Sequence, residues 1–86
     1  MPYGPSIHLD DATRLVPVFD PVLRNYCVQL WMDGRPGGIH GLIENFRDAD
    51  EAVDTLHTFL EAEDVRQLTD KELSDVRTAL HNAGQG

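Results

Sequence analysis

The spacing of apolar residues changes along the chain, and this change limits the possible folds more than any other feature. From Leu23 to Met32 the residues divide by alternation into two faces, which is the period of a half-buried β-strand. After Asp48 the apolar residues recur every three or four positions, as they do on one side of a helix. Strands followed by helices predict an α+β fold with the helices packed on one sheet face.

We expect a small antiparallel sheet of three strands, a β-meander, followed by two helices on one face. The strands are predicted near residues 14–19, 23–32 and 39–46, and the helices near residues 49–63 and 70–82. Asp48 with Glu51, and Thr69 with Glu72, have the spacing of helix capping pairs. Gly84 is predicted to stop the second helix.

Three details of the sheet depend on proline and glycine. Pro17 has no N–H to donate, so the first strand is expected at a sheet edge. The structure of residues 6–14 is left open between two alternatives: Asp10 caps a single helical turn through Arg14, or the chain is already extended over residues 13–19. Residues 33–38 are predicted as the hairpin loop because proline and paired glycines are poor strand residues, and a two-residue turn at 33–34 is the alternative. Both hairpin registers give the same sheet faces.

The length of 86 residues suits a single domain over residues 1–86, with tails at 1–5 and 84–86. With 41% hydrophobic and 26% charged residues, the chain falls in the globular class. It contains no secretion signal and no apolar run of the roughly 20 residues that a membrane span needs. The single cysteine, Cys27, favours a reducing compartment, and we expect a cytoplasmic protein that does not bind membranes.

The charge of the chain is strongly acidic, with a net charge of -8. Residues 44–75 contain eleven acidic and three basic residues, a difference of eight, so this segment accounts for the whole excess. Direct binding of nucleic acid is disfavoured, because it depends on Lys and Arg neutralising phosphates. We expect an acidic face that serves either solubility and salt adaptation or the binding of a basic protein surface.

Two polar groups are candidate ligand sites with simpler explanations. Asp50, Asp54, His57 and Glu61 form one stripe of the first predicted helix, which favours a solvated face over a metal site. Arg35 lies in the glycine-rich loop, which favours a turn over an anion site because no P-loop lysine is present. We therefore expect no metal and no cofactor.

The second face of the sheet is predicted to be exposed. If the helices cover Tyr26, Val28, Leu30, Ile39 and Ile43, then the opposite face carries Cys27, Gln29, Trp31, His40 and Leu42. Such a face is typical of a protein contact, and Trp is common among binding hot spots. The alternative is a Trp31 ring covered by the N-terminal tail. Cys27 and His40 would share this face, and a small thiol beside a surface histidine is favoured there over a nucleophile pair.

These features predict a non-enzymatic protein-binding module of the inhibitor, antitoxin or anti-defence type, which occludes a basic surface of a partner protein. The expected partner-binding residues are Asp50, Asp54, Glu61, Trp31, His40, Leu42 and Arg35. No catalytic residue is predicted. The alternative is a small homodimer, formed through the Trp31 face, that binds a metabolite or performs simple acid–base chemistry between chains.

Overall fold

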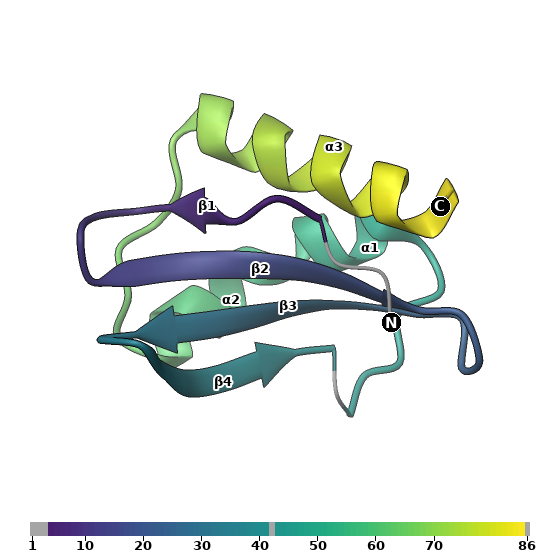
Figure 1. The fold of residues 1–86 in the computed structure, drawn as a ribbon, viewed down its shortest axis with the longest axis horizontal. Coiled ribbons are helices and arrows are strands. Elements are labelled where there is room, and N and C mark those ends of the chain that lie inside the picture. Colours follow the sequence, from purple (N-terminus) through teal and green to yellow (C-terminus); the bar gives the residue numbers. More distant parts are fainter. Residues whose placement is uncertain (1–3, 42, 86) are drawn as a thin grey trace.

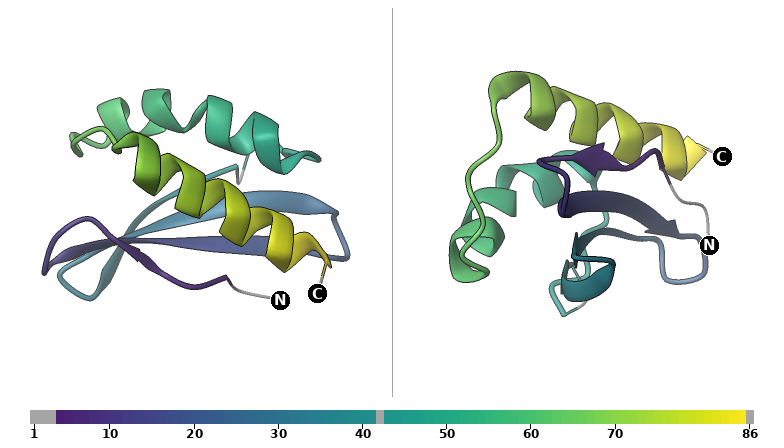
Figure 2. Two further views of the ribbon diagram at one scale, coloured as in Figure 1. Left: turned by 90° about the horizontal axis from the view of Figure 1, so that it is seen from above. Right: turned by 60° about the vertical axis from the view of Figure 1, so that its left-hand side comes forward.

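A computed structural model describes residues 4–41 and 43–85 of the chain, and all side chains among these except that of residue 85. The strands are β1 (Ile7–His8), β2 (Thr13–Asp20), β3 (Asn25–Met32) and β4 (Arg35–His40), and the helices are α1 (Ala49–Asp54), α2 (Leu56–Ala62) and α3 (Asp70–Gln85). The strands form one antiparallel sheet in the order β1-β2-β3-β4 (Figure 1). All three helices lie on one face of this sheet (Figure 2). The α+β class is confirmed, with four strands in place of three.

The additional strand, β1, was not predicted, and of the two alternatives the extended one is confirmed, because β2 begins at Thr13. Ile7 pairs with Leu15 and His8 with Arg14. The carboxylate of Asp10 accepts hydrogen bonds from the backbone amides of Ala12 and Thr13, both at 2.8 Å. Asp10 therefore forms an Asx turn in the loop between β1 and β2 instead of capping a helix. A strand of two residues is too short to show any periodicity in the sequence.

Pro17 lies inside the sheet, so the prediction that its strand is an edge was wrong. β2 pairs with β1 on one side and with β3 on the other. Within a strand, the N and C=O of one residue point to the same side, and the carbonyl of Pro17 accepts from Gly4 at 2.9 Å. The missing N–H of Pro17 thus faces the segment before β1, beyond the two ladder pairs that β1 makes. Gly4, predicted as tail, is bonded to the sheet.

The hairpin between β3 and β4 has the short turn, and the predicted six-residue loop was wrong. Asp33 and Gly34 have φ values of 56° and 76°, the left-handed pair of a type I′ turn, and Met32 pairs with Arg35 across it. Pro36 is tolerated because β4 is an edge strand.

A bulge in β4 changes which side chains face the helices. Trp31 pairs with Pro36 but Leu30 pairs with Gly38, so Gly37 is an extra residue and the register shifts by one. His40 therefore lies opposite Val28 on the helix side, while Ile39 lies opposite Gln29 on the outer side. Both registers considered from the sequence had placed these two side chains on the reverse faces, because neither allowed for a bulge.

The predicted third strand also ends earlier than expected, at His40 instead of residue 46. Gly41 has a φ of 100° and turns the chain out of the sheet. Ile43, predicted in the core, is 90% exposed in the following loop. The chain returns at Phe46, whose carbonyl accepts from Tyr26 at 2.8 Å. Phe46 is buried although it lies in the loop after β4. This is why the apolar pattern of the sequence continues beyond the end of the strand.

The start of β3 is likewise set by a turn. The carboxylate of Asp20 accepts from the amide nitrogens of Val22 and Leu23 at 3.0 and 3.3 Å, which closes the loop between β2 and β3. Leu23, predicted as the first strand residue, is 61% exposed in this loop, and the strand begins at Asn25.

The first predicted helix is divided at Thr55 into α1 and α2. In a continuous helix the carbonyl of Ala52 would accept from Leu56. Here it lies 3.0 Å from Nε2 of His40, and the Thr55 hydroxyl donates to the Glu51 carbonyl at 2.9 Å. Side chains inserted into the hydrogen-bond ladder bend or interrupt a helix. The break is therefore caused by a histidine of the sheet.

The start of α3 confirms the predicted capping box. The Thr69 hydroxyl accepts from the Glu72 amide at 3.2 Å, and the Glu72 carboxylate accepts from the Thr69 amide at 2.9 Å. Arg66 also donates to Glu72, and these hydrogen bonds lower the pKa of the Glu72 carboxyl to about 2. The helix continues to Gln85, so the prediction that Gly84 stops it was wrong. Gly84 instead leaves room for the Tyr26 hydroxyl, which a side chain at this position would meet.

The capping box gives a first prediction. Replacing Thr69 by alanine is expected to lower the free energy of unfolding by about 1 kcal/mol, since the Glu72 amide loses its acceptor. Ser74→Ala, at an exposed position inside α3, is the control and is expected to be neutral or slightly stabilising. Urea unfolding followed by circular dichroism measures both. Equal losses in the two variants would contradict a capping role for Thr69.

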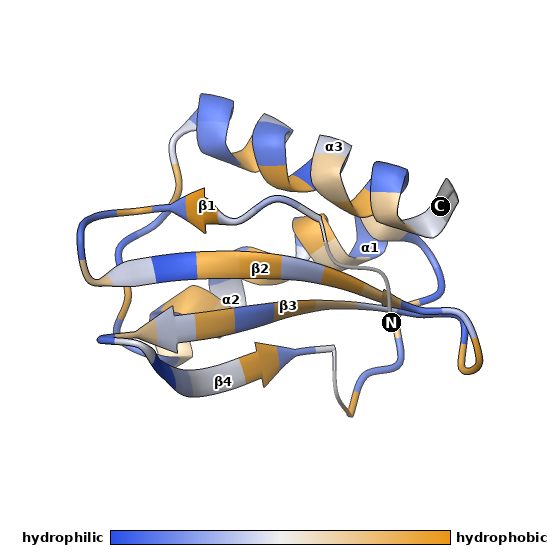
Figure 3. Cartoon of the chain, in the orientation of Figure 1, coloured by the Kyte–Doolittle hydropathy of each residue, from blue (hydrophilic) through white to orange (hydrophobic). Residues whose placement is uncertain are grey.

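The core lies between the sheet and the helices. The apolar side of α3 faces the sheet and its polar side faces outward (Figure 3). The largest fully buried side chains come from both layers and are Leu15, Pro17, Val28, Leu30, Leu56, Leu60, Val76 and Leu80. The inner sheet face and the inner sides of the helices therefore bury one another, and the outer sheet face, the outer sides of the helices and the described loops are left to supply a binding surface.

Candidate functional site

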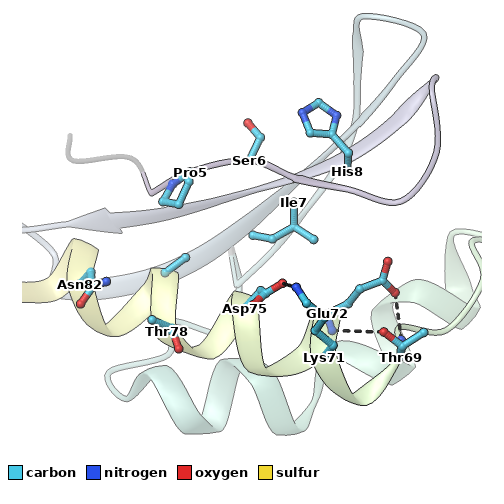
Figure 4. A pocket seen from close by; sticks show the side chains of 11 residues that line it. Pro5, Ser6, Ile7, His8, Thr69, Lys71, Glu72, Asp75, Thr78 and Asn82 are labelled. Carbon is cyan, nitrogen blue, oxygen red and sulfur yellow. Dashed lines mark hydrogen bonds and ion pairs between the residues drawn. The ribbon is translucent and has the colours of Figure 1, made fainter.

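One cavity, of about 610 Å³, lies between α3 and the segment that contains β1 (Figure 4). The side chain of Ile7 points toward the helix, and that of His8 points away from it. The charged groups on the helix side are already paired, Lys71 with Asp75 at 3.0 Å and Glu72 with the Thr69 cap. This groove therefore holds no buried polar group that calls for a ligand.

A second cavity differs in this respect. It has a volume of about 410 Å³ and lies between the end of β4, the loop after it and α2. We define it as the His40 pocket, lined by His40, Glu44, Phe46, Thr55, Thr58, Phe59 and Ala62. Its volume falls within the range of about 300–1,000 Å³ of small-molecule sites. Most of its lining is apolar, and Glu44 is its one acidic side chain, with no Lys or Arg in the lining.

The His40 ring is held tightly in the wall of this pocket. It is 3% exposed and stacks at 4.8 Å from Phe46 and 5.2 Å from Phe59, measured between ring centroids. Nε2 lies 3.0 Å from both the Ala52 carbonyl and the Thr55 hydroxyl oxygen. Nδ1 has no hydrogen-bond partner among the described residues, and its nearest charged group is the Glu44 carboxylate at 3.8 Å. Burial lowers the pKa of His40, although the Ala52 hydrogen bond and the Glu44 charge oppose this shift.

This position corrects the sequence prediction for His40. It is neither exposed nor on the Trp31 face, and Cys27, which pairs with Val18, lies on the opposite side of the sheet. Cys27 and His40 therefore form no nucleophile pair. Burial raises the pKa of the Cys27 thiol further from the neutral range.

The Trp31 side chain does lie on the outer sheet face, and it is half-buried. The Arg14 guanidinium lies 5.1 Å from the centre of its ring, and its Nε1–H donates to Gln29 at 3.1 Å. Leu42, predicted beside it, lies outside the described residues. Ile39 is 38% exposed on this face, in the place that the sequence had assigned to His40.

The acidic stripe of α1 is engaged within the molecule. Arg77 of α3 donates to the carboxylates of both Asp50 and Asp54, and His81 lies 3.2 Å from Asp50. The hydrogen bonds from His81 and Arg77 lower the pKa of the Asp50 carboxyl. Two of the three predicted partner-binding acids thus join α1 to α3, and Glu61 alone is exposed without an ion pair to another described residue.

The fold gathers a different set of acidic residues. The β1–β2 loop, the β3–β4 turn and the α2–α3 loop lie at one end of the molecule, on the left in Figure 1. Asp33 donates its amide to the Ala12 carbonyl at 2.8 Å, and Arg66 donates to the Leu9 carbonyl at 2.9 Å, so the three segments are joined. We define the acidic end by Asp10, Asp11, Asp33, Glu61, Glu63, Asp64 and Asp70.

Three arginines also lie at this end, and one of them, Arg14, lies over the Trp31 ring and lines the same cavity as Asp11 and Asp33. Arg66 is held by the Glu72 carboxylate at 2.8 Å, so its charge is largely compensated. Arg35, a predicted partner-binding residue, is exposed at the start of β4. The remaining excess is negative, and part of it comes from the first half of the chain. Sequence counting could not detect this grouping, because it depends on which loops meet in space.

The structure also bears on the other ligand expectations. Within residues 4–41 and 43–85, no three His, Cys, Asp or Glu side chains are grouped closely enough to hold a metal ion. No helix in the described part of the chain is long and apolar enough to cross a membrane.

Sequence reasoning missed Glu44 and Phe59 as pocket residues. Glu44 follows His40 by four positions, but a loop separates them, so helical spacing offered no signal.

Comparison with protein-family models, with curated proteins and with solved structures finds no match to this chain.

Proposed function

We propose that this protein is a non-enzymatic binding module of the inhibitor, antitoxin or anti-defence type, which occludes a basic surface of a partner protein with its acidic end. One observation carries the proposal. The acids Glu61, Glu63, Asp64 and Asp70 lie in or beside one loop, and none forms an ion pair with another described residue. Uncompensated charge of one sign attracts an oppositely charged partner and speeds association.

The Trp31 side chain supports the same surface. It lies two positions before Asp33, at the end of β3 that enters the acidic end. A half-buried aromatic ring beside a charged rim is the common arrangement of a protein contact. As an alternative, we propose that two copies of the chain associate through the Trp31 face. The cytoplasm is the proposed compartment, on the single free cysteine.

Charge reversal tests this proposal at single positions. A partner is first captured from the cells that express the protein, and its association rate is then measured by surface plasmon resonance. We expect Asp11→Lys and Glu61→Lys to slow association several-fold at low salt, and by less at physiological salt, where charges beyond about 8 Å are screened. Dissociation should change less.

Glu51→Lys is the matched control, because Glu51 is exposed on α1, has no ion pair with a described residue and gives the same change of net charge. Its association rate is expected to stay closer to wild type. If all three variants slowed association equally, the overall charge of the protein, and not the acidic end, would attract the partner. If the association rate did not depend on salt, the acidic residues would serve solubility and not binding. Asp50 and Asp54 are unsuitable for reversal, since they hold Arg77.

A further inference from the structure

The His40 pocket contains two acceptors that face one another. The Nε2 position must carry the proton of a neutral ring, because the Ala52 carbonyl at 3.0 Å can only accept. The Thr55 oxygen can accept from the same N–H, since its own hydroxyl proton is donated to Glu51. Nδ1 of His40 is then left with a buried lone pair that has no donor among the described residues, and a Glu44 carboxylate oxygen lies 3.8 Å away.

These two acceptors cannot satisfy one another while the ring is neutral. Burial disfavours the charged ring, so proton transfer to Nδ1 does not resolve the contact near neutral pH. An acceptor that is buried without a donor costs free energy, and no described side chain supplies that donor. The site is therefore complementary to a donor that arrives from outside the chain.

The charge and shape of the pocket specify what kind of donor fits. Glu44 gives the lining a negative charge, and Phe46, Phe59 and Ala62 give it apolar walls. A nitrogen placed about 2.8 Å from both acceptors can bridge a separation of 3.8 Å, and an ammonium group has three protons to share between them. The nearby aromatic faces also favour a cation.

We propose that the His40 pocket binds a small organic cation, a primary ammonium group carried on a compact apolar body. The ammonium nitrogen donates to His40 Nδ1 and to Glu44, and the apolar body lies against Phe59 and Ala62. This ligand chemistry occurs both in free amines and in lysine side chains of proteins. The binding site is separate from the acidic end, and the assignment does not rest on the proposed function.

Binding is tested with phenethylammonium, 2-phenylethanol and 3-phenylpropionate, which keep a similar apolar body and differ in head group. Isothermal titration calorimetry gives affinities, and nitrogen NMR of the histidine rings locates the site. We expect the ammonium probe to bind about tenfold or more tighter than the alcohol, because its hydrogen bonds are charge-assisted. The His40 Nδ1 resonance should move more than Nε2. Nα-acetyl-lysine methylamide is a further arm, and tighter binding of it than of phenethylammonium would identify a protein side chain as the source.

Two variants separate the pocket from general attraction to an acidic protein. Glu44→Gln keeps the size of a side chain that is 46% exposed, and it should weaken the ammonium probe about tenfold while leaving the alcohol nearly unchanged. Glu51→Gln, with the same loss of charge outside the lining, should leave both affinities at the wild-type value. Circular dichroism confirms that both variants fold.

Several results would overturn the assignment. They are equal weakening by the two variants, a preference for the alcohol or the carboxylate, histidine shifts confined to rings other than His40, and no saturable binding at about 10 mM probe. The acidic-end variants play no part in these measurements, so the proposed protein-binding function stands or fails separately.

Discussion

His40→Asp is expected to lower the free energy of unfolding by more than about 3 kcal/mol, whereas Ile39→Asp should cost about 1 kcal/mol. The aspartate at position 40 would be buried beside the Ala52 carbonyl and the Glu44 carboxylate, with no cation facing it among the described residues. At position 39 the same side chain would lie on the outer face of an edge strand, where 38% of the isoleucine is exposed. A small domain has only about 5–15 kcal/mol of stability, so the first change is severe.

The pair of variants also tests the register of β4 directly. Both introduce the same residue at adjacent positions, so the net charge at neutral pH changes alike, and the loss of a β-branched residue at position 39 works against the expected order. Denaturant unfolding at neutral pH gives the two free energies. If Ile39→Asp were the more damaging change, β4 would lack the bulge at Gly37, and the faces expected from simple alternation would be correct.

Gly41→Ala is expected to be the second large effect, a loss of about 2–6 kcal/mol. The backbone at this position has a φ of 100°, and an added Cβ would lie 2.6 Å from the Tyr26 carbonyl oxygen. Strained backbone costs about 1–3 kcal/mol, and overpacking costs about as much again. The carbonyl belongs to β3 and cannot move without disturbing the sheet.

Gly34→Ala is the matched control for this change. Gly34 also has a positive φ, of 76°, but no atom lies within 4 Å of the added Cβ. Only the left-handed strain of about 1–2 kcal/mol is therefore expected. Thermal or urea unfolding compares the two. Equal losses at both positions would mean that the contact with Tyr26 is relieved and that backbone strain alone determines the cost.

The parts of the fold that could be predicted from the sequence are those with local causes. The α+β class follows from the change of period, and the start of α3 follows from Thr69 and Glu72, which bond to one another within one turn. The β-turn at Asp33 and Gly34 was also readable from its residues. The proline and the paired glycines after it favour a longer loop, but one of these glycines, Gly37, forms a bulge.

The rest depends on contacts between distant residues. His40 faces the core because of the bulge, and at the break between α1 and α2 it bonds to both Ala52 and Thr55. Asp50 and Asp54 have the spacing of a solvated stripe, yet Arg77, more than twenty positions later, lies against them. A periodic pattern gives the face of a helix on which a residue lies, but it does not give the element packed against that face.

The break at Thr55 has a consequence for the order in which the chain can acquire structure. α1 and α2 have six and seven residues, and isolated helices shorter than about 12–15 residues are marginal in water. Neither can persist until the β3–β4 hairpin presents His40 and the apolar inner face. α3, with sixteen residues and its own cap, depends less on contacts with the sheet for its stability. We therefore expect α1 and α2 to form only after the β3–β4 hairpin has formed. A loss of hairpin register would leave residues 49–62 as an unstructured connection.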